Sequence, residues 1–246
     1  MLSKKERDIA NKVANLRDQL LVHEGKKAKS KISQFEVVFH IYSANKNELS
    51  NHLNKVADIE YAKNLFTGQG DVSRIETYRE FVRLFHNYSL SIGSLIDITR
   101  RLMNKYYDEN DILNAYQSKI DSIFVHNALA GFLKDLRNYF THYQVPHIYQ
   151  QLKLSVDKPN YSGFQLMRDK LLEDYNWKSN SKKFLKNQEE RFDVLNLIIS
   201  YDQVVDEFYK WLLETIQDYH SNDLKEMELL KNEIEDLRSR LSFTLL

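Results

Sequence analysis

Residues 73–106 read SRIETYREFVRLFHNYSLSIGSLIDITRRLMNKY. Apolar and aromatic side chains, with one threonine, recur along this stretch at steps of three and four residues, the spacing of one helical face. They are Ile75, Tyr78, Val82, Phe85, Tyr88, Ile92, Leu95, Thr99, Leu102 and Tyr106. The pattern predicts one long helix. Gly93 lies inside it, costs about 1 kcal/mol relative to alanine, and indicates a close helix crossing.

The composition favours an all-α fold. The 246 residues include only six glycines and two prolines, too few for the turns that an all-β or α/β chain of this length requires. Helical spacing returns near Asp169 and is strong over residues 190–219. We therefore expect a bundle of long helices.

Capping signals predict where two of the helices begin. Ser33 with Glu36, and Ser73 with Glu76, match the capping box, in which a serine precedes a glutamate by three residues. Helices are expected to begin near residues 33 and 73. After a break at Asp108–Asp111, a second long helix is predicted over about residues 111–144.

Strand spacing replaces helical spacing after this helix. Residues 148–156 alternate apolar and polar side chains, and Asp157-Lys158-Pro159-Asn160 is typical of a turn. Phe164 and Leu166 would belong to the returning strand. The sequence predicts a small β-hairpin at about residues 147–167, inserted into a helical domain.

We expect a single helical domain over residues 1–219, followed by a C-terminal helix over residues 220–246. A short apolar seam runs along that helix and covers about two heptads, fewer than an independent coiled coil needs. The seam is formed by Met227, Leu230, Ile234, Leu237 and Leu241. Two alternatives follow: the helix packs back on its own domain, or it lies at a dimer interface.

Charge and cysteine content exclude several classes of function. Thirty-five basic residues balance thirty-five acidic ones, so RNA binding would have to depend on a local patch. The chain has no cysteine and no apolar run near the roughly 18 residues of a membrane span. His-Glu-x-x-His and Gly-rich phosphate-binding motifs are missing too. We expect a soluble, cytoplasmic protein without membrane contact, cofactor or metal site.

The candidate for chemistry is residues 136–146, LRNYFTHYQVP. Arg137, Asn138 and His142 lie at the end of the predicted helix, which Pro146 stops. Asp135, Asn138 and His142 share one face, so that Asn138 can reach the imidazole. Arg137 lies about 140° around the helix from His142. For both to act on one phosphate, the helix end distorts, the arginine wraps around, or a second subunit supplies the partner.

This motif resembles that of HEPN-domain ribonucleases, an all-α family with an arginine, a polar residue and then a histidine after four to six intervening residues. The resemblance implies a HEPN-like helical bundle that dimerises, with both motifs lining one cleft, and cleavage of RNA without a metal ion. His142 would take the proton from a ribose 2′-hydroxyl, Arg137 would stabilise the phosphate charge, and Asn138 would hold the imidazole or contact the phosphate. Related proteins include toxins and antiviral effectors, so an antitoxin or regulatory partner is also implied.

A non-catalytic interpretation of these residues stays open. Arginine is followed by histidine at similar spacing at Arg17 and at Arg79, so the spacing alone is not specific. Arg137 could be an ordinary surface charge and His142 a favourable cation at a helix C-terminus. In that case the chain would be a non-catalytic helical sensor or a protein-interaction module.

Overall fold

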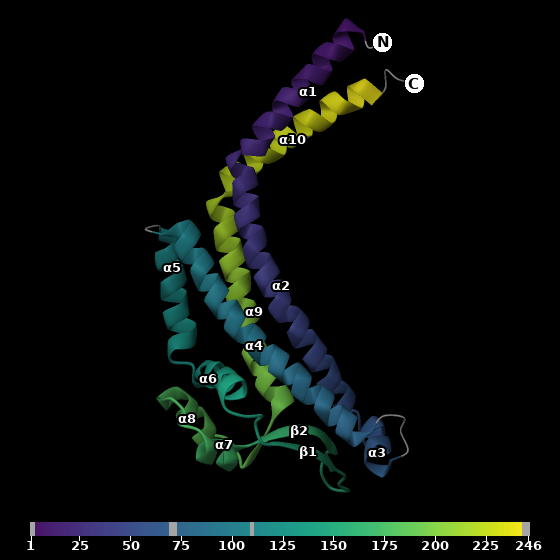
Figure 1. Ribbon diagram of the computed structural model, residues 1–246, viewed down its shortest axis with the longest axis vertical. Helices are drawn as coiled ribbons and strands as arrows, with labels where there is room; N and C mark the ends of the chain where they lie inside the picture. Colours follow the sequence, from purple (N-terminus) through teal and green to yellow (C-terminus); the bar gives the residue numbers. More distant parts are fainter. Residues whose placement is uncertain (1–2, 69–72, 109–110, 243–246) are drawn as a thin grey trace. The chain divides into compact units, whose positions relative to one another are not determined.

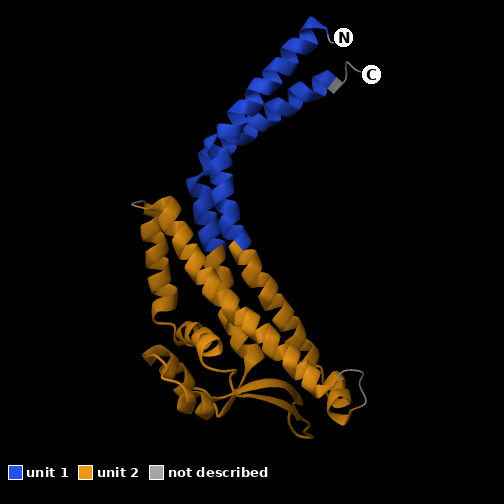
Figure 2. Cartoon of the chain, viewed as in Figure 1, with its two compact units in different colours: residues 1–37, 210–246 blue, residues 38–209 orange. Residues whose placement is uncertain are grey.

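The computed structural model describes residues 3–68, 73–108 and 111–242. These residues form ten α-helices, one short π-helix and a three-stranded antiparallel sheet (Figure 1). The predicted mostly helical chain with a small hairpin is therefore confirmed. Two compact units can be distinguished, residues 38–209 and the paired segments 1–37 and 210–246 (Figure 2).

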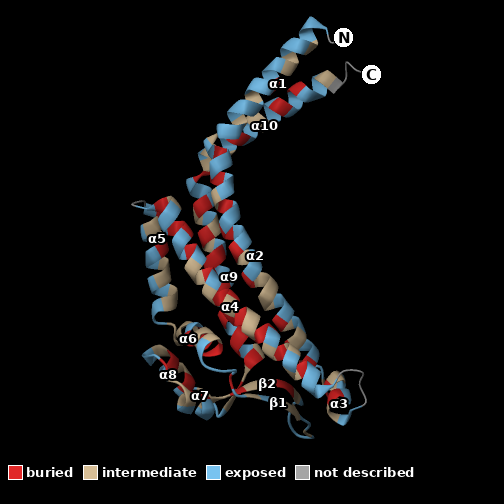
Figure 3. Cartoon of the chain, in the orientation of Figure 1, coloured by how far each residue is buried: buried red, intermediate tan, exposed pale blue. Residues whose placement is uncertain are grey.

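The helix predicted from residues 73–106 is α4 (Arg74–Tyr107). Ser73 caps it: the Ser73 hydroxyl accepts a hydrogen bond from the Glu76 amide at 3.1 Å, and the Glu76 carboxylate accepts one from the Ser73 amide at 3.2 Å. The predicted face is buried from Phe85 to Leu102, as the red segments of α4 in Figure 3 show, whereas Ile75 at its start is 62% exposed. The start near residue 73 is confirmed.

The predicted helix start near residue 33 is wrong. Ser33 lies inside α2 (Glu24–Ala57), which runs unbroken through this position. Ala28, Ile32 and Phe35 are buried on either side of Ser33, so the apolar face that continues from residue 28 outweighs the local capping signal. A capping box marks a helix start only where the preceding residues lack helical packing.

The predicted helix over residues 111–144 is broken into three pieces. They are α5 (Asp111–Ile120), the π-helix η1 (Asp121–Val125) and α6 (Ala128–His142). Asn127 ends the break, because its side chain accepts a hydrogen bond from the Ala130 amide at 3.0 Å and caps α6. The interruption was not predicted, because the helical spacing of apolar residues continues through it.

The hairpin consists of β1 (Ile148–Lys153) and β2 (Tyr161–Met167), which pair antiparallel with Ile148 opposite Leu166. A third strand, β3 (Arg191–Asp193), adds to β2 and was not expected from the sequence. Helix α3 (Ile59–Thr67) contacts both strands of the hairpin. The Ser162 hydroxyl also donates to the Val56 carbonyl of α2 at 2.6 Å, which fixes the hairpin to the helices.

Two short helices connect the hairpin to α9 (Val194–Tyr219), namely α7 (Arg168–Asp174) and α8 (Ser179–Lys186). Between them Trp177 is buried and donates its indole N–H to the Leu171 carbonyl at 2.5 Å. Its ring stacks on Tyr139 of α6, with centroids 5.4 Å apart. These contacts hold α7 and α8 against the helix that carries the motif.

The other unit contains α1 (Lys4–Val22) and α10 (Ser221–Ser242), which pack against each other. Val13 of α1 packs with Ile234 and Leu237 of α10, and the three are buried. The apolar seam predicted on the C-terminal helix therefore faces α1. Lys12 adds an exposed ion pair to Glu233 at 2.8 Å.

Candidate functional site

Helix α6 carries the motif and is held on two sides. Its apolar face, with Phe132, Leu133, Leu136 and Tyr139, is fully buried and packs against α4 and α8. Gly131 allows the approach to α8, because a Cβ there would lie 2.9 Å from the Asn180 Cβ. The motif thus lies on a packed helix whose last residue, His142, is exposed.

Asp135 does not belong to an exposed face with Asn138 and His142. It is 3% exposed, and its carboxylate accepts hydrogen bonds from the Ser181 hydroxyl at 2.7 Å and from the Lys178 amide at 3.3 Å. These donors lie at the start of α8, where a carboxylate satisfies free backbone amides. Asp135 therefore joins α6 to α8, a role that the sequence did not indicate.

Arg137 lies across α4 and is held by three groups. Its guanidinium covers Gly93, where a Cβ would lie 2.5 Å from Nε and 2.9 Å from Nη2. Nη2 lies 3.5 Å from the Asp97 carboxylate, and Nη1 donates to the Asn138 amide oxygen at 3.0 Å. The side chain keeps 32% of its surface exposed. At Gly93, where a close helix crossing was predicted, the space beside the glycine is filled by the Arg137 side chain.

Asn138 and His142 are not paired with each other. The Asn138 oxygen accepts from Arg137, its neighbour in the chain. His142 is the last residue of α6 and is exposed, and within the described parts of the chain no group forms a hydrogen bond or ion pair with its imidazole. The structure therefore brings Arg137 and Asn138 together and leaves the imidazole free to contact another molecule.

A second polar cluster lies just beyond the motif, centred on the Asp174 carboxylate at the end of α7. One carboxylate oxygen lies 3.1 Å from the Tyr139 hydroxyl, 2.7 Å from the Gln144 amide nitrogen and 2.9 Å from His147 Nε2. Burial, the largest cause, raises the pKa of Tyr139 to about 12, so this hydroxyl stays protonated and donates. This cluster could not be predicted from the sequence, because its members are up to 35 residues apart.

The arrangement offers an anion site at Arg137, on the helix that ends in His142. Arg137 can donate two parallel hydrogen bonds to phosphate oxygens. Its contact with Asp97 is long and partly solvent-exposed, and such pairs contribute little, so a phosphate can compete for the guanidinium. His147 is oriented by a carboxylate, whereas His142 is not.

No family model, curated protein or solved structure matches this chain. Among the described residues, no group of three or more histidine or acidic side chains is arranged to hold a metal ion. The helices described are also too short or too polar to cross a bilayer.

Proposed function

We propose that this protein is a metal-independent endoribonuclease of the HEPN type, with Arg137, Asn138 and His142 as its catalytic residues. The observation that carries the proposal is the partly exposed guanidinium of Arg137, positioned by Gly93, Asn138 and Asp97 on the helix that ends in the free imidazole of His142. A buried or fully paired His142 would have argued against it.

The chemistry needs two proton transfers. His142 takes the proton from a ribose 2′-hydroxyl while that oxygen attacks the adjacent phosphorus, and the bond to the 5′-oxygen breaks. Arg137 stabilises the charge on the phosphate oxygens, and Asn138 keeps the guanidinium oriented. The leaving oxygen takes a proton from water and becomes a 5′-hydroxyl, while the other fragment ends in a 2′,3′-cyclic phosphate.

We further propose that the enzyme acts as a homodimer and is controlled by an antitoxin or regulatory protein, in the manner of a toxin or an antiviral effector. Support for the dimer is geometric. Arg137 is directed onto α4, and His142 lies at the open end of α6, so that a second copy can supply the imidazole that acts on the phosphate bound by Arg137. Support for the regulator is the resemblance of the motif.

The first test incubates the purified full chain with cellular RNA in excess EDTA. We expect His142→Ala and Arg137→Ala each to reduce cleavage by at least roughly 100-fold. His40→Ala, which removes an exposed histidine of α2, should cleave like the wild type. Equal cleavage by wild type and His142→Ala, or cleavage that EDTA abolishes, would contradict the proposal. A chain that never cleaves RNA but binds another protein would instead favour the interaction module.

Mixing two inactive variants tests whether the site is shared. If each site combines Arg137 of one copy with His142 of the other, mixed dimers of Arg137→Ala and His142→Ala contain one intact site. Random exchange should then recover about a quarter of the wild-type activity. Recovery at the level of the separate variants would show that each subunit works alone.

A further inference from the structure

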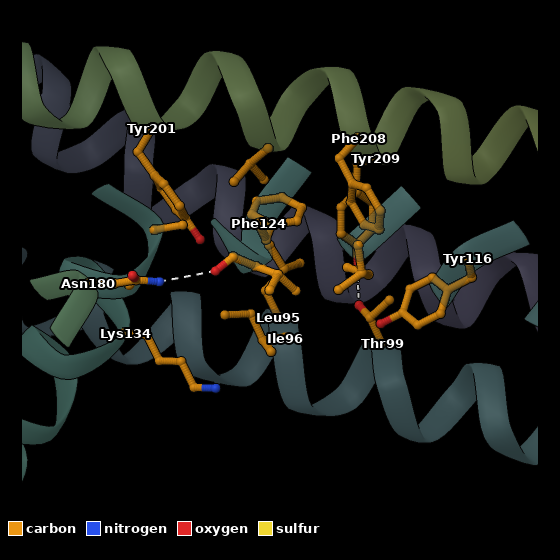
Figure 4. Close-up of a pocket in the computed structure, with 15 residues that line it drawn as sticks. Leu95, Ile96, Thr99, Tyr116, Phe124, Lys134, Asn180, Tyr201, Phe208 and Tyr209 are labelled. Carbon is orange, nitrogen blue, oxygen red and sulfur yellow. Dashed lines mark hydrogen bonds between the residues drawn. The ribbon is translucent and has the colours of Figure 1, made fainter. Parts of the chain in front are cut away.

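An apolar pocket of about 390 Å³ lies within residues 38–209, apart from the motif. Its wall is formed by α4, α5, η1, α6, α8 and α9. The volume falls within the range of roughly 300–1,000 Å³ that is usual for small-molecule sites. Apolar and aromatic side chains line most of it, among them Leu95, Ile96, Phe124, Val205 and Phe208 (Figure 4).

Tyr201 supplies a buried polar group without a protein partner. The residue is 2% exposed, and no described residue forms a hydrogen bond with its hydroxyl. Figure 4 shows the hydroxyl directed into the space between Phe124 and Asn180. Burial raises the pKa of Tyr201, so the hydroxyl stays protonated and can donate. Because this hydroxyl borders the pocket and no described residue accepts from it, it can donate to a ligand that carries an acceptor.

Two further polar side chains lie at the same end of the pocket. The Asn180 amide donates to the Val125 carbonyl at 3.0 Å, and Lys134, an exposed residue of α6, also lines the pocket (Figure 4). The opposite end is bordered by Tyr116 and Phe208, whose rings lie 6.1 Å apart. Thr99 and Tyr209 also border the pocket, but their hydroxyls bond to each other. The lining therefore carries a cation at one end and no charged side chain at the other.

The backbone of the wall supports a binding role. Phe124 and Val125 belong to the π-helix η1, which interrupts the predicted long helix at this place. Single π-turns are rare and occur frequently at functional sites. The irregular turn places Phe124 against Phe208, with ring centroids 5.3 Å apart, and turns the Val125 carbonyl toward Asn180.

We propose that this pocket binds an apolar monocarboxylate, with the carboxylate between Tyr201, Asn180 and Lys134 and the hydrocarbon directed toward Tyr116 and Phe208. The Tyr201 hydroxyl donates to the carboxylate, and Lys134 balances its charge. The site is separate from the phosphate chemistry of Arg137, and its occupancy is measured without RNA. Its failure and that of the nuclease proposal are therefore distinguishable.

The test titrates the full chain with decanoate by isothermal titration calorimetry. Decanol, which has the same chain length but no charge, is the control ligand, and both are used below the concentrations at which they aggregate. Decanoate is expected to bind one site per chain, and decanol at least roughly 10-fold more weakly. Tyr201→Phe should weaken decanoate binding roughly 10-fold without loss of stability, because the hydroxyl has no described protein partner. Lys134→Met should weaken it by about 2–5-fold.

A blocking variant completes the experiment. Ile96→Trp fills the pocket and should abolish binding. Ile98→Trp should bind like the wild type, because Ile98 lies outside the pocket lining and is 37% exposed. Circular dichroism establishes that each variant is folded. The proposal would be overturned if wild type shows no saturable binding of decanoate, if Tyr201→Phe and Ile96→Trp both bind normally, or if decanol binds as tightly as decanoate.

Discussion

The guanidinium of Arg137 occupies the space that a side chain at Gly93 would fill. A Cβ on Gly93 would lie 3.0 Å from the arginine Cζ and closer still to Nε. The obstructing atoms are the end of a flexible side chain, not backbone, and can move aside. Glycine in the middle of α4 is costly for the helix, yet it positions the cation that we assign to phosphate binding.

Gly93→Ala should therefore separate stability from activity. Alanine stabilises the helix by about 1 kcal/mol relative to glycine. Its methyl group also displaces the Arg137 guanidinium from its position between Asp97 and Asn138. We expect unchanged or higher stability in urea and RNA cleavage reduced by roughly 10-fold or more. Normal cleavage by a stably folded Gly93→Ala variant would show that RNA cleavage does not depend on this position of the guanidinium.

Gly25→Ala should have the opposite effect on stability. A Cβ there would clash with the backbone carbonyl of Asp223 and would lie 2.6 Å from the Met227 Cβ. Backbone at the start of α10 cannot move aside without unpacking, so we expect a cost of about 1–3 kcal/mol. Hydrogen exchange should become faster in residues 4–22 and 221–242. Unchanged protection there would contradict the close packing of α2 and α10.

Asp202 should make stability depend on pH. This buried carboxylate accepts hydrogen bonds from the Tyr42 and Tyr88 hydroxyls, and burial, the largest effect, raises its pKa to about 6. The unfolded chain releases this proton near its ordinary pKa of 3.8. Between about pH 4 and pH 6 the folded state therefore binds more protons, and stability falls as pH rises, by about 3 kcal/mol in total.

Asp202→Asn should remove this part of the pH dependence, because the amide cannot ionise but its oxygen still accepts from the tyrosines. Urea unfolding at pH 4.5 and pH 7.5 measures it. Asp218→Asn, which changes an exposed residue of the same helix α9, serves as the control. The same slope in wild type and Asp202→Asn would mean that other groups cause the pH dependence.

Asn127→Ala should destabilise the helix that carries the motif. It removes the side-chain acceptor for the Ala130 amide and should cost about 1 kcal/mol in urea unfolding. Asn127→Asp keeps an acceptor at this position and should retain most of the stability. An equal loss in both variants would indicate that Asn127 acts through packing and not as a cap.

Much of the helical structure could be predicted because it depends on local periodicity. The apolar spacing of α4 and the capping box at Ser73 act within a few residues of each other, and the structure contains both. Alternation after Pro146 similarly predicted the hairpin of β1 and β2. The same local reasoning was wrong at Ser33, where packing of the residues before it extends the helix, and over residues 111–144, where η1 interrupts it.

The sequence by itself determined that Arg137, Asn138 and His142 lie at the C-terminal end of a helix. Only the tertiary structure decided their surroundings: Arg137 rests on Gly93 and Asp97 of α4, and Asp174 of α7 holds His147. The pocket beside Tyr201 also depends on several separate helices. The physical reason is the separation along the sequence of the residues that interact. Helix periodicity is set by neighbours three and four residues apart, whereas these contacts join residues that only packing brings together.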